Sequence, residues 1–202
     1  MCEENNQFNN SSGRLLYLIG RSGVGKDTVL NALKPHLDQS VTIIKRYITR
    51  EYDASGEDHI PVTDEEFMRM QNLGMFSLYW ESHGLKYGIG REMEQELLLG
   101  RTVIVNGSRE YLKRASELFP KLEVIEIYAD PDIVTTRLFQ RKRESLSGIM
   151  ERLERGAEQF LVPESLLTYQ IDNSGNLLDA VDTFLNILRP QRGTLPVNVN
   201  AI

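Results

Sequence analysis

The sequence has little cysteine and no long apolar run. Its single cysteine, Cys2, cannot form a disulfide within the chain, which favours a reducing, cytoplasmic setting. No apolar stretch approaches the ~20 residues that a membrane-spanning helix needs. The polar start of the sequence has neither the basic nor the apolar region of a secretory signal. We therefore expect neither a disulfide scaffold nor a membrane partner.

Basic residues are also in the minority. The chain has 23 Lys and Arg against 29 Asp and Glu, which gives a formal net charge of −6. A surface of this sign repels nucleic acid, so we expect no nucleic-acid partner. The 41% of hydrophobic residues is enough to form a full core in a chain of 202 residues. A site for phosphorylated ligands would have to gather its positive charge locally.

Five short apolar runs alternate with helical patterns. The runs lie at residues 15–19, 41–44, 102–105, 124–128 and 168–171. The helical patterns lie at residues 27–37, 92–100, 109–119, 132–143, 149–160 and 176–188. Apolar runs without alternation are typical of buried parallel strands, and their alternation with helices indicates helices on both faces of a sheet. The sequence therefore predicts an α/β fold with an open, mostly parallel five-stranded sheet.

One domain is predicted over residues 14–189, between a disordered leader (1–13) and a loose C-terminal tail (190–202). Within it, the segment at about 46–91 is rich in Tyr, Arg, Glu, Gly and His and has few apolar runs. We interpret this segment as an insertion that carries a site rather than part of the core.

A glycine-rich loop follows the first predicted strand and precedes a predicted helix. It reads GRSGVGKD and fits the phosphate-loop pattern G-x-x-x-x-G-K. The predicted ATP-binding residues here are Gly20, Arg21, Ser22, Gly23, Val24, Gly25, Lys26, Asp27 and Thr28. Backbone N–H groups of such a loop bind phosphate oxygens, and Lys26 reaches the β- and γ-phosphates. This pattern predicts an enzyme that moves the terminal phosphoryl group of ATP onto a small acceptor.

The residue after the loop lysine departs from the usual pattern. A Ser or Thr hydroxyl normally binds Mg²⁺ at this position, whereas this chain has Asp27, followed by Thr28. An aspartate oxygen is a suitable ligand for Mg²⁺. We therefore expect Mg²⁺ as the cofactor, with Asp27 or Thr28 as its protein ligand; a helix-capping role for Asp27 is the alternative.

A second basic cluster is predicted to form a lid at about residues 137–155. It contains Arg137, Arg141, Lys142, Arg143, Arg152 and Arg155. The planar guanidinium binds phosphate oxygens in pairs, and a closing lid excludes water from the transfer. A solvated helix pair is the alternative. Asn173 follows the last predicted strand, where it would contact adenine or serve in a turn or cap.

The order of these motifs resembles that of guanylate kinases. The phosphate loop, RYITR (46–50), KYG (86–88), the lid arginines and the Asn173 loop all follow that order, over residues 14–188. The resemblance implies a phosphate-loop NTPase fold with an acceptor-binding subdomain and a lid. By this resemblance Arg50 and Tyr87 would grip the acceptor's phosphate. Arg137, Arg141 and Arg152 would act with Lys26 as catalytic residues that stabilise the transferring group.

The positions that read guanine do not match. Guanylate kinases have carboxylates there, and this chain has Leu78, Asn106 and Ser108. Each lost charge-assisted hydrogen bond is worth about 1.5–3 kcal/mol. Guanine recognition is therefore expected to be absent.

A second resemblance accounts for this departure. GRSGVGKD (20–27), KRYITR (45–50), EDHI (57–60), GLKYGIG (84–90) and VNGSRE (105–110) together resemble ribose 1,5-bisphosphate phosphokinases. These relatives of guanylate kinases make 5-phosphoribosyl 1-diphosphate and ADP from ribose 1,5-bisphosphate and ATP, usually in phosphonate metabolism, and have Asp after the loop lysine. The predicted substrate-binding residues are Arg46, Thr49, Arg50, Tyr87, Asn106, Ser108 and Arg109. The implied partners are small molecules, ATP and a phosphorylated ribose.

Three alternatives stay open at this point. They are a guanylate or other nucleoside monophosphate kinase, a catalytically inactive kinase-like nucleotide-binding module, and a nucleotide-switch ATPase. The oligomeric state is also open, with a homodimer as one alternative. For His59 and His83, which lie in polar segments, we favour surface hydrogen bonding over catalysis.

Overall fold

A five-stranded parallel sheet forms the centre of the molecule. The computed structural model describes residues 13–51, 57–140, 160 and 162–189. The sheet has the strand order β2-β7-β1-β8-β9, and all of its neighbouring strands are parallel. The strands are β1 (Arg14–Ile19), β2 (Val41–Ile44), β7 (Thr102–Asn106), β8 (Glu123–Tyr128) and β9 (Thr168–Asp172). Each lies on one of the five apolar runs, so the predicted sheet is confirmed.

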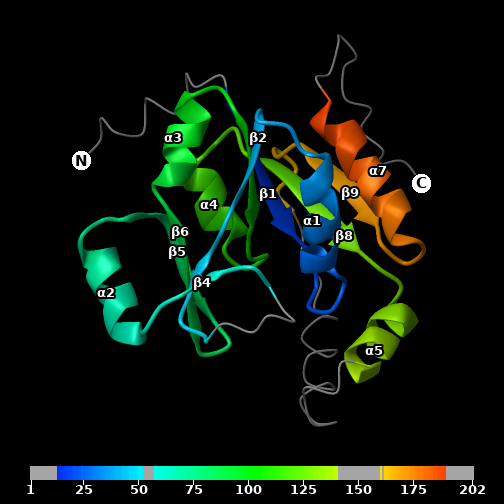
Figure 1. Ribbon diagram of the computed structural model, residues 1–202, viewed down its shortest axis with the longest axis horizontal. Coiled ribbons are helices and arrows are strands. Elements are labelled where there is room, and N and C mark those ends of the chain that lie inside the picture. The colour runs from blue at the N-terminus through cyan, green and yellow to red at the C-terminus, as the bar shows by residue number, and fades with distance from the viewer. Residues whose placement is uncertain (1–12, 52–56, 141–159, 161, 190–202) are drawn as a thin grey trace.

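Helices cover both faces of this sheet (Figure 1). On one face lie α1 (Lys26–Leu33) and α7 (Leu177–Leu188), and on the other α3 (Glu92–Leu98) and α4 (Leu112–Leu118). Successive side chains of a strand point to opposite faces, so Leu16 packs in the first layer and Tyr17 in the second. A 3-10 turn (Lys34–His36) extends α1, and α5 (Pro131–Gln140) follows β8. No helix in the described part of the chain is both long and apolar enough to cross a bilayer.

Residues 47–90 build a second sheet, in the order β4-β3-β6-β5. Its elements are β3 (Tyr47–Ile48), β4 (Ile60–Pro61), β5 (Phe76–Ser82) and β6 (Leu85–Gly90), with α2 (Asp64–Asn72) between β4 and β5. The two-residue turn between β5 and β6 has positive φ at His83 (55°) and Gly84 (72°), as a type I′ hairpin requires. A capping box between Thr63 and Glu66 starts α2.

The interpretation of this segment as lying outside the core is wrong. Leu78, Trp80 and Ile89 are buried in the same cluster as Tyr17 of the central sheet. His59 is only 4% exposed, which corrects the expectation of a surface group, whereas His83 is exposed as expected. The second sheet is therefore anchored on the central one, which fixes the predicted acceptor residues relative to the phosphate loop.

Several predicted features lie outside the described residues. They are Arg141, Arg152 and the rest of the lid beyond Gln140, the helix over 149–160 except residue 160, residues 1–12 of the leader, and the tail 190–202.

Candidate active site

The phosphate loop lies between β1 and α1. Gly25 ends it with φ 93°, a left-handed conformation that glycine adopts without steric cost. A Cβ atom at Gly25 would lie only 2.6 Å from Nδ2 of Asn173. That Nδ2 donates a hydrogen bond to the carbonyl oxygen of Val24 over 2.7 Å. Asn173 is thus brought against the loop and supports its backbone, while its contact with adenine stays a prediction.

Lys26 folds back over the loop that precedes it. Its Nζ donates to the carbonyl oxygens of Gly20 (2.8 Å) and Arg21 (3.3 Å). Burial lowers the pKa of Lys26 to about 8; the Asp27 carboxylate opposes this shift, and the positive charges of Arg46 and Arg109 add to it. The loop lysine therefore lies within electrostatic range of two predicted acceptor arginines. A bound triphosphate would offset the repulsion among these cations.

This lowered pKa predicts a pH dependence of ATP binding. The triphosphate favours protonated Lys26, so binding should take up a proton at pH 8–9, where part of the free enzyme has lost it. Below pH 8 Lys26 is already mostly protonated in the free enzyme, so it should contribute little to the pH dependence of ATP affinity. Above pH 8 affinity should fall, by up to about tenfold per pH unit. Calorimetry at pH 8.5 in two buffers of different ionisation enthalpy measures the proton uptake. Lys26→Arg, which stays protonated, should abolish it, and wild-type binding without uptake would contradict the prediction.

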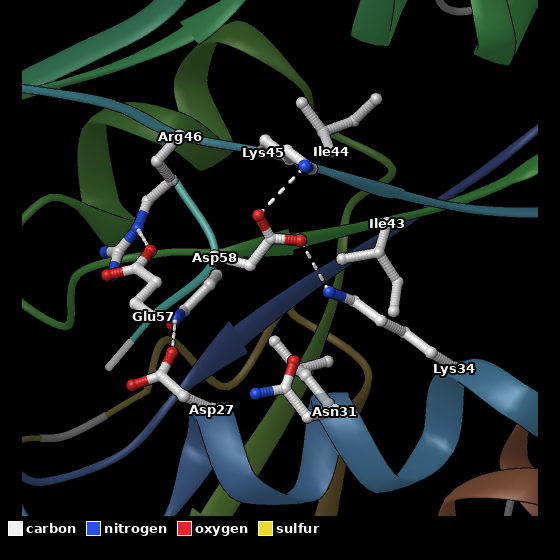
Figure 2. A pocket seen from close by; sticks show the side chains of 11 residues that line it. Asp27, Asn31, Lys34, Ile43, Ile44, Lys45, Arg46, Glu57 and Asp58 are labelled. Carbon is white, nitrogen blue, oxygen red and sulfur yellow. Dashed lines mark hydrogen bonds and ion pairs between the residues drawn. The ribbon is translucent and has the colours of Figure 1, made fainter. Parts of the chain in front are cut away.

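On the acceptor side, Arg46 is paired rather than free. Its Nε and Nη2 donate to the two carboxylate oxygens of Glu57 over 2.5 and 2.6 Å, as Figure 2 shows. The Arg46 guanidinium also lies over the ring of Tyr87, 5.0 Å from its centroid. Tyr87 in turn stacks on Trp80, with centroids 5.4 Å apart and ring planes 5° apart. Arg50 approaches the same carboxylate to 3.6 Å and is more exposed. The structure thus brings Arg46, Arg50 and Tyr87 together around Glu57.

The other predicted substrate residues are held by backbone contacts or ring contacts. Thr49 accepts a hydrogen bond from the backbone N–H of Lys86 over 2.9 Å. The Tyr17 hydroxyl accepts from the N–H of Ser108 (3.1 Å) and donates to its carbonyl oxygen (3.2 Å). The Arg109 guanidinium lies 5.9 Å from the ring centroid of Phe160. Thr49 therefore ties the second sheet together, and Ser108 has its backbone fixed beside the central sheet.

Glu57 and Asp58 are functional candidates that the sequence pattern alone did not single out, and they lie next to His59. Asp58 pairs with Lys34, just beyond α1, and with Lys45, at 2.8 Å each, and so links the phosphate-loop helix to the acceptor side (Figure 2). The His59 ring nitrogens lie 2.9 Å from the carbonyl oxygen of Glu57 and 3.1 Å from that of Arg50. The only sequence signal for Glu57 and Asp58 was the EDHI resemblance, which gave these two residues no role.

A cavity opens between α1 and the predicted acceptor residues. Its lining includes Asp27, Arg46, Glu57 and Asn106, and Figure 2 shows Asp27 facing it from α1. Nδ2 of Asn106 donates to Oδ1 of Asp27 over 2.9 Å. Thr28, the other predicted metal ligand, is exposed. Within the described ranges no group of three or more His, Cys, Asp or Glu side chains could hold a metal ion. Of the two predicted metal ligands, Asp27 is thus the one that lines the cavity.

From the lid side, Arg137 reaches the loop. Its Nη1 lies 3.5 Å from the carbonyl oxygen of Val24. Of the three predicted lid arginines with catalytic roles, it is the one within the described residues. The end of α5 thus carries a cation to the place where the triphosphate is expected.

Comparison with known proteins decides the family. No family model matches the chain. It is 42% identical over 178 residues to the ribose 1,5-bisphosphate phosphokinase PhnN of Achromobacter xylosoxidans, covering 87% of this chain and 92% of the relative. It is 40% identical over 182 residues to the PhnN of Psychromonas ingrahamii, with coverages of 90% and 92%. The chain belongs to the ribose 1,5-bisphosphate phosphokinase family.

The fold of this family member is that of guanylate kinases. The structure is similar to the crystal structure of guanylate kinase from Anaplasma phagocytophilum, with a TM-score of 0.66 and 21% sequence identity, covering 89% of this chain and 86% of the other. The predicted guanylate-kinase-like fold is therefore confirmed.

The base-reading positions fit a ribose 1,5-bisphosphate phosphokinase rather than a guanylate kinase. Leu78 is fully buried in the core, the Asn106 amide is bonded to Asp27, and Ser108 is fixed by Tyr17. None of these three offers a carboxylate to a guanine edge. The charged side chains that line the cavity are both basic and acidic, namely Lys34, Lys45, Arg46, Asp27, Glu57 and Asp58.

Proposed function

We propose that this protein transfers the γ-phosphoryl group of ATP to the 1-phosphate of ribose 1,5-bisphosphate, giving 5-phosphoribosyl 1-diphosphate and ADP. Membership of the phosphokinase family at about 40% identity over most of the chain carries this proposal. The arginines beside the phosphate loop support it, because an acceptor with two phosphates and no base needs cations rather than base-reading groups.

The proposed reaction needs positioning and charge neutralisation more than proton transfer. An oxygen of the 1-phosphate is already anionic at neutral pH, so it attacks the γ-phosphorus without a general base. The new O–P bond forms as the bond from the γ-phosphorus to the β–γ bridging oxygen breaks, and ADP leaves with that electron pair. Lys26 would bind the triphosphate from the loop, and Arg137 would stabilise the transferring group from the lid. Arg50, with Arg46 and Tyr87, would hold the acceptor.

Mg²⁺ fits this site as the cofactor. Asp27 supplies a hard oxygen ligand on the cavity wall, beside the buried amide of Asn106. When bound, Mg²⁺ would be held by Asp27 and would neutralise part of the charge of the triphosphate. We further propose a cytoplasmic setting, which the single cysteine supports.

Product analysis tests the function directly. Incubation with ATP and ribose 1,5-bisphosphate should yield 5-phosphoribosyl 1-diphosphate by mass spectrometry, with ADP in equal amount. Parallel assays with GMP and AMP as acceptors should give far slower ADP formation. Faster transfer to GMP would overturn the assignment in favour of a nucleoside monophosphate kinase. No ADP with any acceptor would indicate an inactive binding module, and ADP without an acceptor an ATPase.

A further inference from the structure

Two positions that normally bind Mg²⁺ in phosphate-loop enzymes both carry unusual residues here. In that class a Ser or Thr hydroxyl after the loop lysine and a carboxylate following a core strand hold the ion. This chain has Asp27 after the lysine. At the end of β7, the strand paired in parallel with β1, it has Asn106. The carboxylate and the neutral group have thus exchanged places along the chain.

The exchanged residues contact each other. Nδ2 of Asn106 donates to Oδ1 of Asp27 over 2.9 Å, and both residues line the cavity beside the phosphate loop. An ionised carboxylate only accepts hydrogen bonds, so Asp27 requires the NH₂ side of the amide. This fixes Oδ1 of Asn106 on the opposite side.

The environment of Oδ1 of Asn106 is a second, independent indication that this pair belongs to a binding site. Asn106 is 4% exposed, and its Oδ1 has no hydrogen-bond partner within the described part of the chain. Buried polar atoms are seldom left unpaired in a finished site. An amide oxygen can accept a hydrogen bond from an O–H or N–H donor, or bind a cation directly. An anionic phosphate oxygen is excluded, and a water in the Mg²⁺ shell, which is a strong donor, is suitable.

The helix-capping alternative for Asp27 does not account for these contacts. The N-cap of α1 is Gly25, and no side chain caps this end of the helix. The carboxylate instead accepts from a residue 79 positions away in the sequence.

We propose that Asp27 and Asn106 form an exchanged magnesium pair. Asp27 supplies a carboxylate to the site from the helix. Asn106 orients that carboxylate through Nδ2 and accepts a hydrogen bond from a metal-bound water through Oδ1. The exchange preserves one negative charge and one hydrogen bond between helix and strand. The proposal deepens the proposed function, since it rests on Mg²⁺–ATP as the phosphoryl donor.

Reversal of the exchange is the test. Mn²⁺ binding to the full chain with a non-hydrolysable ATP analogue is measured by electron paramagnetic resonance, for wild type, Asp27→Thr, and Asp27→Thr combined with Asn106→Asp. Loss of a ligand or of its orienting partner typically weakens metal binding about 10–100-fold. We expect a loss of this size in Asp27→Thr, and recovery to within a few-fold of wild type in the double variant, which has the usual arrangement of hydroxyl and carboxylate.

Two further variants make the result specific. Asp27→Asn keeps the size of the side chain but removes its charge, so it should also weaken Mn²⁺ binding if Asp27→Thr folds poorly. Asp38→Asn removes the same charge from an exposed turn, where Asp38 accepts hydrogen bonds from Ser40, and should leave Mn²⁺ binding unchanged. The proposal would be overturned if Asp27→Asn bound Mn²⁺ with wild-type affinity. It would also be overturned if the double variant bound Mn²⁺ no more tightly than Asp27→Thr. The assay contains no acceptor, so its outcome is independent of whether ribose 1,5-bisphosphate is the substrate.

Discussion

Replacement of Arg137 by alanine is expected to lower kcat by about 10³-fold or more and to change ATP affinity far less. Arg137 extends from α5, and its Nη1 lies 3.5 Å from the carbonyl oxygen of Val24 in the phosphate loop. A guanidinium placed there would stabilise charge that develops on the transferring group. An interaction that is stronger in the transition state than in the ground state acts on kcat rather than on binding. Steady-state rates and direct ATP binding measure the two effects separately.

Two matched variants separate this role from a general effect of charge. Arg137→Lys keeps the charge but lacks the planar fork that binds two phosphate oxygens, so it should recover little of the loss. Arg114→Ala removes an exposed arginine that pairs with Glu117 on α4, and its kcat should match that of wild type. If Arg137→Ala instead lost ATP affinity and kept the wild-type kcat, Arg137 would only support the phosphate loop and would have no role in phosphoryl transfer.

The central sheet was predictable because its inner strands β1, β7 and β8 are largely buried on both faces. Such strands read as continuous apolar runs, and the run at 102–105, for example, became β7 (Thr102–Asn106). The phosphate loop was predictable for a different reason. Its backbone conformation needs glycine at fixed positions, such as Gly25 with φ 93°. Both signals are local, and a single sequence displays them fully.

The second sheet was missed because its apolar signal is weaker. In β5 only every second residue is buried, namely Phe76, Leu78 and Trp80, and polar residues lie between them. Together with the His83–Gly84 turn, this alternation is a hairpin signal. The two-residue strands β3 and β4 are too short to carry such a pattern. Their place is fixed by pairing, because β3 pairs with β6 and β4 pairs with β3.

Pairing within the site could not be read from the sequence. Arg46 looked like a free phosphate ligand, yet two oxygens of Glu57 hold it. The bond from Asn106 to Asp27 joins positions 79 residues apart. Composition shows which charges are available, whereas their partners depend on how the two sheets pack together.

Replacement of Glu57 by alanine should have the largest effect on stability. The Arg46 and Glu57 side chains are only 12% and 11% exposed. Removal of Glu57 leaves a largely buried guanidinium without its anion, and breaking a buried pair in this way costs about 3–5 kcal/mol. In a chain of 202 residues this loss corresponds to a fall of about 10 °C in Tm. Thermal and urea unfolding of both proteins measure it.

Glu117→Ala is the matched control, because its partner Arg114 and Glu117 itself are 60% and 50% exposed and such surface pairs contribute little to stability. Arg46→Met with Glu57→Leu removes both charges and should regain most of the stability, since apolar replacement of a buried pair is often neutral.

Inorganic phosphate should raise the Tm of Glu57→Ala more than that of wild type. In Glu57→Ala a phosphate ion in the acceptor site would replace the negative charge of Glu57. Because the ion binds only to the folded state, it raises the Tm. An equal rise in Tm in the two proteins would instead show that Arg46 faces no anion site. Arg50 would then be the residue that holds the acceptor's phosphate.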